Sequence, residues 1–387
     1  MSASPQRTFA EFFAGIGLMR LGLERAGWKI AYANDICPGK FEMYRANFED
    51  ADDHFVVEDI HDVLAADVPT VLLATASFPC NDLSLAGARA GLKGSQSSAF
   101  YGFARILREM RCRRPRFILV ENVSGLLSSN DGKDFREVML TLNKLGYSVD
   151  PFIIDASHFV PQSRQRLFIV GELRSDSALK AEDRAEAAEF YQSEIRPRAL
   201  AEFVFNNPDI DWRLRELPKL PQSLRRLISI LEDLPHNRSE WWNEKRTAYL
   251  LNQMSQRHRI LVDKMIDAAG WSFGTVFRRV RAGRSMAELR VDGIAGCLRT
   301  PRGGSGRQIL VKAGFGEFHA RLLTPKECAR LMGANDFTIS GSLNQALFGF
   351  GDAVCVPVIH WIAQHYLEAR IQESRELYAD GDKRAYG

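Results

Sequence analysis

Residues 7–35 read RTFAEFFAGIGLMRLGLERAGWKIAYAND, and this stretch decides the fold. A β-rich run at 7–13 leads into a turn with two glycines, a helical pattern follows at 18–27, and a second β-rich run lies at 29–34. Parallel strands need a crossover connection, which is usually a helix. The stretch therefore predicts a β-α-β unit, the repeating element of an open α/β sheet.

The same alternation of short β-rich runs and helical patterns continues to residue 173. Five more runs have strand character, at 54–59, 70–76, 116–122, 147–155 and 166–173. A helical pattern at 135–146 ends on a glycine, which suits a helix stop. The pattern predicts an α/β fold with a seven-stranded, mostly parallel, Rossmann-like sheet and helices on both faces. Because no helical pattern separates the last two runs, we expect those two strands to be antiparallel.

The alternation breaks near residue 174, where an acidic run at 178–191 begins and a polar stretch with several prolines follows. We expect a domain boundary there. The length of 387 residues and the 45% hydrophobic content suit one large domain and one smaller domain, each with its own core.

Composition and cysteine spacing exclude several classes of protein. The sequence has no run of about 18 apolar residues and no signal-peptide pattern at its start, which predicts a cytoplasmic location. The 6 cysteines show neither C-x-x-C spacing nor histidines at zinc spacing. We therefore expect free thiols and no metal site. The net charge of +3 is too small to indicate a nucleic-acid partner by itself.

The glycine turn after the first strand suggests a nucleotide-type ligand. Its glycines, Gly15 and Gly17, allow a ligand to approach the backbone, but the next glycine is Gly22, which does not match the G-x-G-x-x-G pattern of a nicotinamide site. The second strand ends at Asp35, and the third is followed by Asp59 and Ile60. Carboxylates at strand ends can hold ribose hydroxyls and an adenine amino group, so an adenosine ligand fits.

A second group of candidate residues combines a thiol, a carboxyl group and two guanidinium groups. Cys80 lies in SFPCNDLS (77–84), where a proline stiffens the loop and the following polar residues favour a turn. Glu121 lies at the carboxyl end of the fifth strand, where ligands of such sheets bind. Arg164 and Arg166 are two positions apart, so they point to the same side of an extended segment.

Six motifs in this order resemble those of the DNA (cytosine-5) methyltransferases of prokaryotic restriction-modification or defence systems. They are FFAGIG (12–17), FPCNDLS (78–84), ENV (121–123), QSRQR (162–166), RLLTPKECARLMG (321–333) and FGFGDAVCVPV (348–358). The resemblance implies S-adenosyl-L-methionine as cofactor and double-stranded DNA as partner, and it leaves a cognate restriction or defence protein open. It implies a catalytic and cofactor-binding domain at 1–173, a target-recognition domain at 174–340 and a closing segment at 341–387.

The resemblance also assigns roles to individual residues. Cys80 is the nucleophile that adds to carbon 6 of the cytosine, and Glu121 assists at ring nitrogen 3. Arg166 holds the exocyclic oxygen, and Arg164 acts beside it in the backbone or thiolate region. The residues implied for cofactor binding are Phe13, Ala14, Gly15, Gly17, Asp35, Ile36, Asp59, Ile60, Pro79 and Asp352.

An arginine-rich stretch at 275–310 is the expected DNA-binding surface. It holds 8 arginines against Glu288 and Asp292, a local charge of 8 minus 2, or +6. Arginines can bind phosphates or guanine edges. The candidates are Arg278, Arg279, Arg281, Arg284, Arg302 and Arg307. A solvated basic surface is the simpler alternative. For Trp241 and Trp242 we favour structural roles over base stacking.

The sequence departs from the family pattern at three positions, and two other functions stay open. Glu11 replaces the usual aspartate, Asn81 replaces a common glutamine, and Asp352 replaces the asparagine of the closing motif. An acid at the last position could change the affinity for a positively charged cofactor. The alternatives are a tRNA cytosine-5 methyltransferase, whose Cys-Phe-Thr-type signature is absent from the sequence, and a catalytically silent DNA-binding or regulatory module, against which the intact candidate residues argue.

Overall fold

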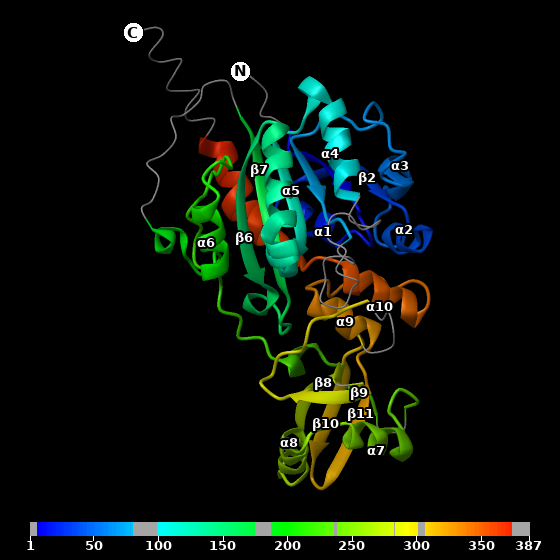
Figure 1. Ribbon diagram of the computed structural model, residues 1–387. Coiled ribbons are helices and arrows are strands. Elements are labelled where there is room, and N and C mark those ends of the chain that lie inside the picture. The colour runs from blue at the N-terminus through cyan, green and yellow to red at the C-terminus, as the bar shows by residue number, and fades with distance from the viewer. Residues whose placement is uncertain are drawn as a thin grey trace.

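The computed structural model describes residues 6–79, 99–174, 187–235, 238–281, 283–300 and 306–373. These residues form a large lobe on a seven-stranded sheet and a smaller lobe on a four-stranded sheet (Figure 1).

The large sheet contains the seven strands that the sequence predicts. They are β1 (Thr8–Phe12), β2 (Lys29–Asp35), β3 (Phe55–Val57), β4 (Leu73–Ala76), β5 (Phe117–Val123), β6 (Tyr147–Asp155) and β7 (Gln165–Leu173). Their order in space is β3-β2-β1-β4-β5-β7-β6. β1 to β5 pair in parallel, and β7 is antiparallel to both of its neighbours. The predicted antiparallel pair is confirmed, with β7 lying between β5 and β6.

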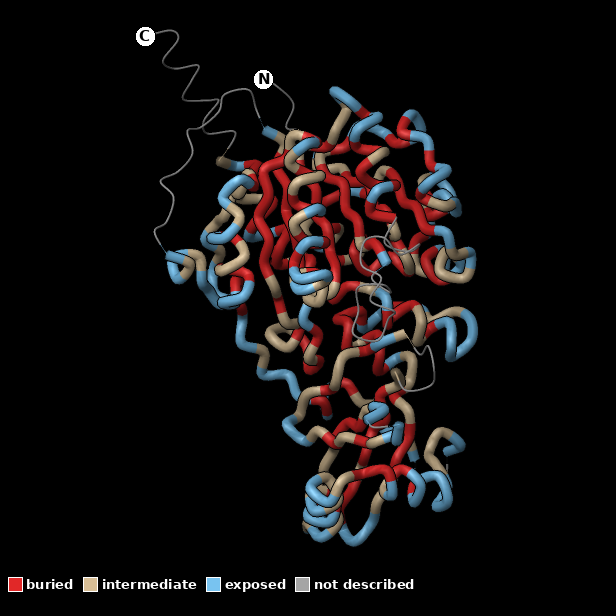
Figure 2. Tube along the Cα trace, viewed as in Figure 1, coloured by how far each residue is buried: buried red, intermediate tan, exposed pale blue. Residues whose placement is uncertain are grey.

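Helices cover both faces of this sheet, because successive strand residues point to opposite sides. In β5, Phe117 and Leu119 pack into one core, and Ile118 and Val120 pack into the other. The first core includes residues of α1 (Leu18–Arg25), α2 (Pro38–Arg45), α3 (Ala51–His54) and α11 (Val356–Ile362), and the second includes residues of α4 (Ala99–Glu109) and α5 (Lys133–Lys144). The buried strands run through the middle of the lobe (Figure 2).

The chain stays on the large sheet for some distance after the strand–helix alternation ends. Most of the acidic run at 178–191 lies outside the described residues. Beyond it, the N–H of Ile153 in β6 donates to the carbonyl of Ile195 at 2.7 Å, and that of Arg213 donates to Val149 at 2.9 Å. α6 (Arg198–Asn206) adds Leu200 to the second core. The segment up to about residue 213 therefore packs beside β6 in the large lobe.

The smaller lobe is an antiparallel sheet with two helices packed on it. Its strands are β8 (Ser272–Arg281), β9 (Arg284–Arg290), β10 (Ile309–Gly314) and β11 (Glu317–Leu322), in the order β11-β10-β8-β9. α7 (Glu244–Asn252) and α8 (Gln256–Ile266) supply Leu250 and Val262 to its core. Trp242 packs against this core, and Trp241 packs beside Arg321 of β11, where the first core reaches the junction of the lobes. These contacts support the structural roles that we favoured.

The motif at 321–333 joins the two lobes. α9 (Pro325–Leu331) begins with a capping box at Thr324, and its Glu327 forms a bidentate ion pair with Arg321 of β11 at 2.6 and 2.7 Å. Both side chains are almost fully buried. Glu327 also accepts the backbone N–H of Glu232 at 2.9 Å. Because a buried charge is costly unless it is paired, this carboxylate fixes β11, α9 and the segment near residue 232 in one arrangement.

The last part of the described chain returns to the large lobe. It comprises α10 (Leu343–Asp352), α11 and a π-helical turn, Ala363–Leu367. Among the described residues, one stretch, Leu343–Glu373, is long and apolar enough by composition to cross a membrane, but 67% of its most apolar window is buried inside the protein. A Cβ on Gly22 of α1 would lie 2.6 Å from Ile359 of α11. This close helix contact identifies the stretch as part of the core.

Candidate active site

A cavity of about 1370 Å³ opens at the carboxyl ends of β1, β2, β4 and β5. Its lining includes most of the residues that the sequence assigns to a cofactor or a base, namely Phe13, Ala14, Gly15, Asp35, Ile36, Asp59, Ile60, Pro79, Glu121, Arg166 and Asp352. Gly17 and Arg164 do not line it. Cys80 lies outside the described residues, and Pro79, which precedes it in the sequence, lines the cavity.

The glycine turn between β1 and α1 adopts backbone conformations that side chains disfavour. Phe13, Gly15 and Gly17 have φ values of 60°, 59° and 84°. The N–H of Gly17 donates to the carbonyl of Ala14 at 2.9 Å, which closes the turn. A Cβ on Gly17 would lie 2.5 Å from the ring of Phe48. Gly17 therefore lets the turn pack closely against the ring of Phe48, and Gly15 presents its backbone to the cavity.

Two carboxylates and an exposed isoleucine form one end of the cavity. Asp35 accepts the backbone N–H of Gly15 and that of Cys37, each at 2.9 Å. Asp59 accepts the N–H of His61 at 2.9 Å. A carboxylate has about four lone-pair positions, so both side chains keep acceptors for a ligand. Ile36 is 63% exposed and offers an apolar face. The free acceptor positions suit the hydroxyl and amino groups of an adenosine, and the apolar face suits its ring.

A buried carboxyl group, that of Glu11, lies in the lining of the cavity. The side chain lines the cavity and is 2% exposed, and its Oε2 has no hydrogen-bond partner among the described residues. Burial raises the pKa of Glu11 well above its usual range, and the positive charge of Arg20 opposes this shift. A buried acceptor without a partner is expected to meet a donor. The ammonium group of S-adenosyl-L-methionine is such a donor, so the residues present fit this cofactor.

Asp352, which departs from the family pattern, forms an ion pair across the cavity wall. Its Oδ2 lies 2.9 Å from the Nζ of Lys40 on α2. Although burial lowers the pKa of Lys40, the negative charges of Asp352 and Asp35 raise it more. Lys40 therefore offsets the charge that the substitution introduces. The pair also joins α2 to α10 beside residues that the sequence assigns to the cofactor.

Glu121 and Arg166 meet at the other end of the cavity. They come from the neighbouring antiparallel strands β5 and β7, and Arg166 Nε lies 3.0 Å from Glu121 Oε1. Glu121 is 5% exposed. Burial raises its pKa, whereas the positive charges of Arg166 and Arg164 lower it, and the net shift is upward. The net upward shift in pKa favours a carboxyl group that can donate a proton.

Arg164 has a different environment from Arg166. It is 2% exposed, and its guanidinium group donates to the carbonyls of Leu298, Gly351 and Ala353. It also donates to Cys297 Sγ at 3.4 Å. These partners come from the arginine-rich stretch and from α10, so Arg164 holds these two segments beside β7. The resemblance assigned it to the backbone or thiolate region next to the cytosine, and the described contacts are those of a positioning residue.

The candidate DNA-binding arginines divide into two groups in space. Arg279 and Arg281 of β8 lie 3.6 and 2.9 Å from Glu288 of β9, which offsets part of their charge. Arg278 points to the opposite face of β8 because it is one residue away. There it lies near Arg307, Arg246 and Trp242. Arg284 is exposed at the start of β9, and Arg302 lies outside the described residues.

Comparison with known proteins identifies the family to which this arrangement belongs. The family C-5 cytosine-specific DNA methylase matches residues 7–368, which is nearly the whole chain. The chain belongs to this family. It is therefore a DNA (cytosine-5) methyltransferase that uses S-adenosyl-L-methionine.

Curated relatives of this methyltransferase agree with the assignment. The DNA-cytosine methyltransferase of Escherichia coli (strain K12) is 28% identical over 95% of this chain and 79% of the relative. The Type II methyltransferase M.DsaV of Dactylococcopsis salina is 29% identical over 94% of this chain and 86% of the relative. The Type II methyltransferase M.HhaI of Haemophilus parahaemolyticus is 25% identical over 92% of each chain.

Solved structures of other methyltransferases share the fold. The Dnmt2 methyltransferase of S. pombe superposes with a TM-score of 0.57 at 20% identity and covers 92% of this chain and 96% of that one. The Entamoeba histolytica methyltransferase EhMeth superposes with a TM-score of 0.61 at 15% identity, and the match covers 93% of this chain and 97% of that one. At these identities the likeness shows the fold alone, and it confirms the Rossmann-like α/β class.

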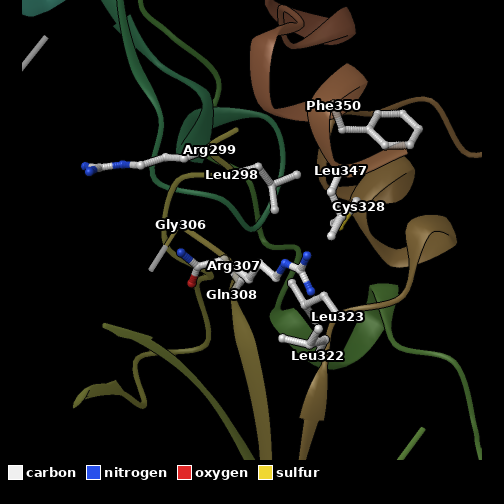
Figure 3. Close-up of a pocket in the computed structure, with 10 residues that line it drawn as sticks. All are labelled: Leu298, Arg299, Gly306, Arg307, Gln308, Leu322, Leu323, Cys328, Leu347 and Phe350. Carbon is white, nitrogen blue, oxygen red and sulfur yellow. The ribbon is translucent and has the colours of Figure 1, made fainter. Parts of the chain in front are cut away.

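A segment of the arginine-rich stretch that was not among the sequence-based candidates also lines the cavity of the methyltransferase. It consists of Cys297, Leu298 and Arg299, and the last two also line a small neighbouring pocket with Cys328 and Leu347. Figure 3 shows the side chain of Arg299 extending away from Leu298. Burial raises the pKa of Cys297, but the charges of Arg164, Arg166 and Arg299 produce a net decrease. The position of Cys297, Leu298 and Arg299 within the arginine-rich stretch was the available signal.

Proposed function

We propose that the cavity is the catalytic chamber in which Cys80, Glu121 and Arg166 act on a cytosine flipped out of duplex DNA. The observation that carries the proposal is the ion pair between buried Glu121 and partly buried Arg166. It lines the same cavity as the carboxylates that suit an adenosine. A carboxyl group with a raised pKa and a guanidinium group at the end of a sheet can hold a polar ring while excluding water.

The chain's own groups make carbon 5 of the cytosine reactive. The thiolate of Cys80 adds to carbon 6, and a new carbon–sulfur bond forms while electron density moves into the ring. Glu121 donates a proton or a strong hydrogen bond to nitrogen 3, and Arg166 holds the exocyclic oxygen. When bound, S-adenosyl-L-methionine would supply an electrophilic methyl group on a positively charged sulfur. The activated carbon 5 then forms a bond to this methyl group, the bond from the methyl group to sulfur breaks, and neutral S-adenosylhomocysteine is left. Carbon 5 finally loses its proton, the carbon–sulfur bond breaks, and Cys80 leaves as a thiolate.

The second lobe supplies the energy that base flipping requires. Extruding a base from a duplex costs about a few kcal/mol. We infer that residues between about 214 and 320, with the arginines of β8 and β9, bind the duplex and select the methylated site. The segment up to about residue 213 packs on the large sheet instead. In functional terms we keep the division into a catalytic part at 1–173, a recognition part within 174–340 and a closing segment at 341–387.

A trapped adduct tests the catalytic proposal. With 5-fluorocytosine at the target position and S-adenosyl-L-methionine present, fluorine blocks the loss of a proton from carbon 5. We expect a protein–DNA complex that survives denaturing electrophoresis and maps to Cys80. Cys80→Ala should abolish both the adduct and methylation, whereas the control Cys112→Ala, at an exposed thiol, should keep both. An adduct on another cysteine would refute the proposed chemistry.

We also propose that the methylation takes place in the cytoplasm and belongs to a restriction-modification system. Two of the relatives are named Type II methyltransferases, which supports this setting. In it, methylation protects cellular DNA from a cognate endonuclease. Bisulfite sequencing of DNA from cells that express the protein should show one short sequence methylated throughout. Scattered methylation without a common sequence would contradict a role in restriction-modification.

A further inference from the structure

Three arginines gather around one tryptophan in the smaller lobe. Arg246 of α7 stacks on Trp242, with its guanidinium carbon 3.9 Å from the ring centroid, and Arg278 of β8 lies over the same ring at 5.8 Å. Arg307, just before β10, is the third member, because its charge and that of Arg278 act on Arg246. Segments that are far apart in the sequence thus bring three cations to one place. We call this group the arginine cluster.

No carboxylate among the described residues pairs with the arginine cluster. Within the described ranges, no ion pair joins any of the three guanidinium groups to a carboxylate, in contrast to Arg279 and Arg281, which share Glu288. Burial and the charges of Arg278 and Arg307 lower the pKa of Arg246, as expected for cations that repel one another. Three like charges at close range are unfavourable unless an anion joins them.

Two members of the cluster also have unsatisfied donors. The Nε atoms of Arg278 and Arg307 are buried and have no hydrogen-bond partner among the described residues. A buried donor without an acceptor costs free energy, so such groups usually mark a missing partner. Trp242 anchors the arrangement, because its backbone N–H donates to the carbonyl of Ala320 at 2.9 Å and its ring packs on the core of the smaller lobe.

The arginine cluster is connected to the rim of the catalytic cavity. The Nη2 of Arg307 donates to the side-chain oxygen of Asn344 at 2.6 Å, and Asn344 of α10 lines that cavity. Figure 3 shows Arg307 at the junction of the two lobes, near Leu323. An anion held by the cluster would therefore lie close to a residue that lines the catalytic cavity.

We propose that Arg246, Arg278 and Arg307 form a binding site for a phosphate group of the DNA backbone, with Trp242 as its support. Planar guanidinium groups match the oxygens of a phosphate and bind it through paired hydrogen bonds. A phosphate contact positions the duplex without reading its sequence. The proposal rests on the proposed function in that DNA is the ligand, and it assigns Arg246, which lies outside the arginine-rich stretch, to the DNA surface.

The test measures the binding of two labelled DNA duplexes of different sequence over a range of salt concentrations. Arg246→Gln should weaken the binding of both duplexes equally, by about tenfold at low salt, because a charge-assisted contact is lost. The slope of log affinity against log salt should fall by about 1, as expected for one phosphate contact. Arg246→Lys should restore most of the slope, since it keeps the charge, but only part of the affinity.

A matched control and separate readouts distinguish the possible failures. Arg259→Gln, at an exposed arginine that pairs with Asp263 on its own helix, should leave the salt slope unchanged. The affinity for S-adenosyl-L-methionine should be unchanged in both variants. An unchanged salt slope in Arg246→Gln would overturn the phosphate assignment. A loss of affinity confined to one duplex would also overturn it, because it would show that Arg246 recognises a base. Absence of tritium transfer to DNA by the unmodified protein would instead refute the proposed function.

Discussion

Replacing Asp352 by asparagine should change how the protein distinguishes charged from uncharged cofactor forms. The substitution removes a carboxylate whose oxygen lies 2.9 Å from Lys40 Nζ and leaves the ammonium group in the cavity wall. S-adenosyl-L-methionine has a positive sulfur, whereas S-adenosylhomocysteine does not. The unpaired Lys40 should therefore repel the first ligand more than the second.

The size of this effect follows from the exposure of the ion pair. The side chain of Asp352 is 45% exposed and that of Lys40 is 24% exposed, so solvent screens the interaction. Pairs of this kind contribute about 0.5–1 kcal/mol, which corresponds to a factor of about two to five in affinity. We expect the ratio of the two dissociation constants to shift by that factor against S-adenosyl-L-methionine.

Isothermal titration calorimetry with both ligands measures the ratio directly. Effects of the substitution on folding or on shared contacts cancel, because both ligands have the same adenosine and amino acid groups. The double variant Lys40→Met with Asp352→Asn removes both charges and should return the ratio toward its original value. An equal loss of affinity for both ligands in Asp352→Asn, or a ratio that the double variant does not restore, would refute the electrostatic explanation.

Three further changes test other parts of the structure. The rate of tritium transfer should fall as pH rises through the raised pKa of Glu121, because the protonated carboxyl is lost, and the residual activity of Glu121→Gln should lack this fall. Glu327→Gln leaves a buried arginine without its full partner and should lower the free energy of unfolding in urea by about 3–5 kcal/mol. The control Asp209→Asn breaks the ion pair with Arg136, in which the side chain of Asp209 is 55% exposed. It should lower the free energy of unfolding by at most about 1 kcal/mol. Gly17→Ala, at φ 84° and with a ring atom 2.5 Å from the new Cβ, should weaken cofactor binding at least several-fold by equilibrium dialysis, whereas Gly270→Ala, with open space around it, should not.

Local patterns in the sequence were sufficient to predict the strands of the large sheet and part of the candidate active site. The run at 147–155 was predicted as a strand and is β6 over the same residues. Asp35 and Asp59 were placed at one ligand by their positions after successive strands, and both line the cavity. Such predictions succeed because strand periodicity and the polarity of a parallel sheet are local properties that fix which ends of the strands meet.

Contacts between distant segments could not be predicted from local patterns in the sequence. The arginine-rich stretch looked like one basic surface, but Glu288 offsets two of its charges, whereas Arg278 and Arg307 join Arg246 on the other face. Arg164 and Arg166 follow the same sequence pattern, yet Arg164 is surrounded by carbonyls of two remote segments. The effect of a charge depends on its neighbours and burial, and these arise only when the chain is folded.

The sequence by itself determined the alternating α/β fold, the family and the identity of the candidate catalytic residues, because these depend on periodicity and on motifs that lie within short segments. The tertiary structure alone decided that β7 lies between β5 and β6, which puts Arg166 beside Glu121. It also decided that Lys40 offsets the charge of Asp352. Strand order and ion pairing join residues that are tens or hundreds of positions apart, and the core packing that brings them together is a property of the whole chain.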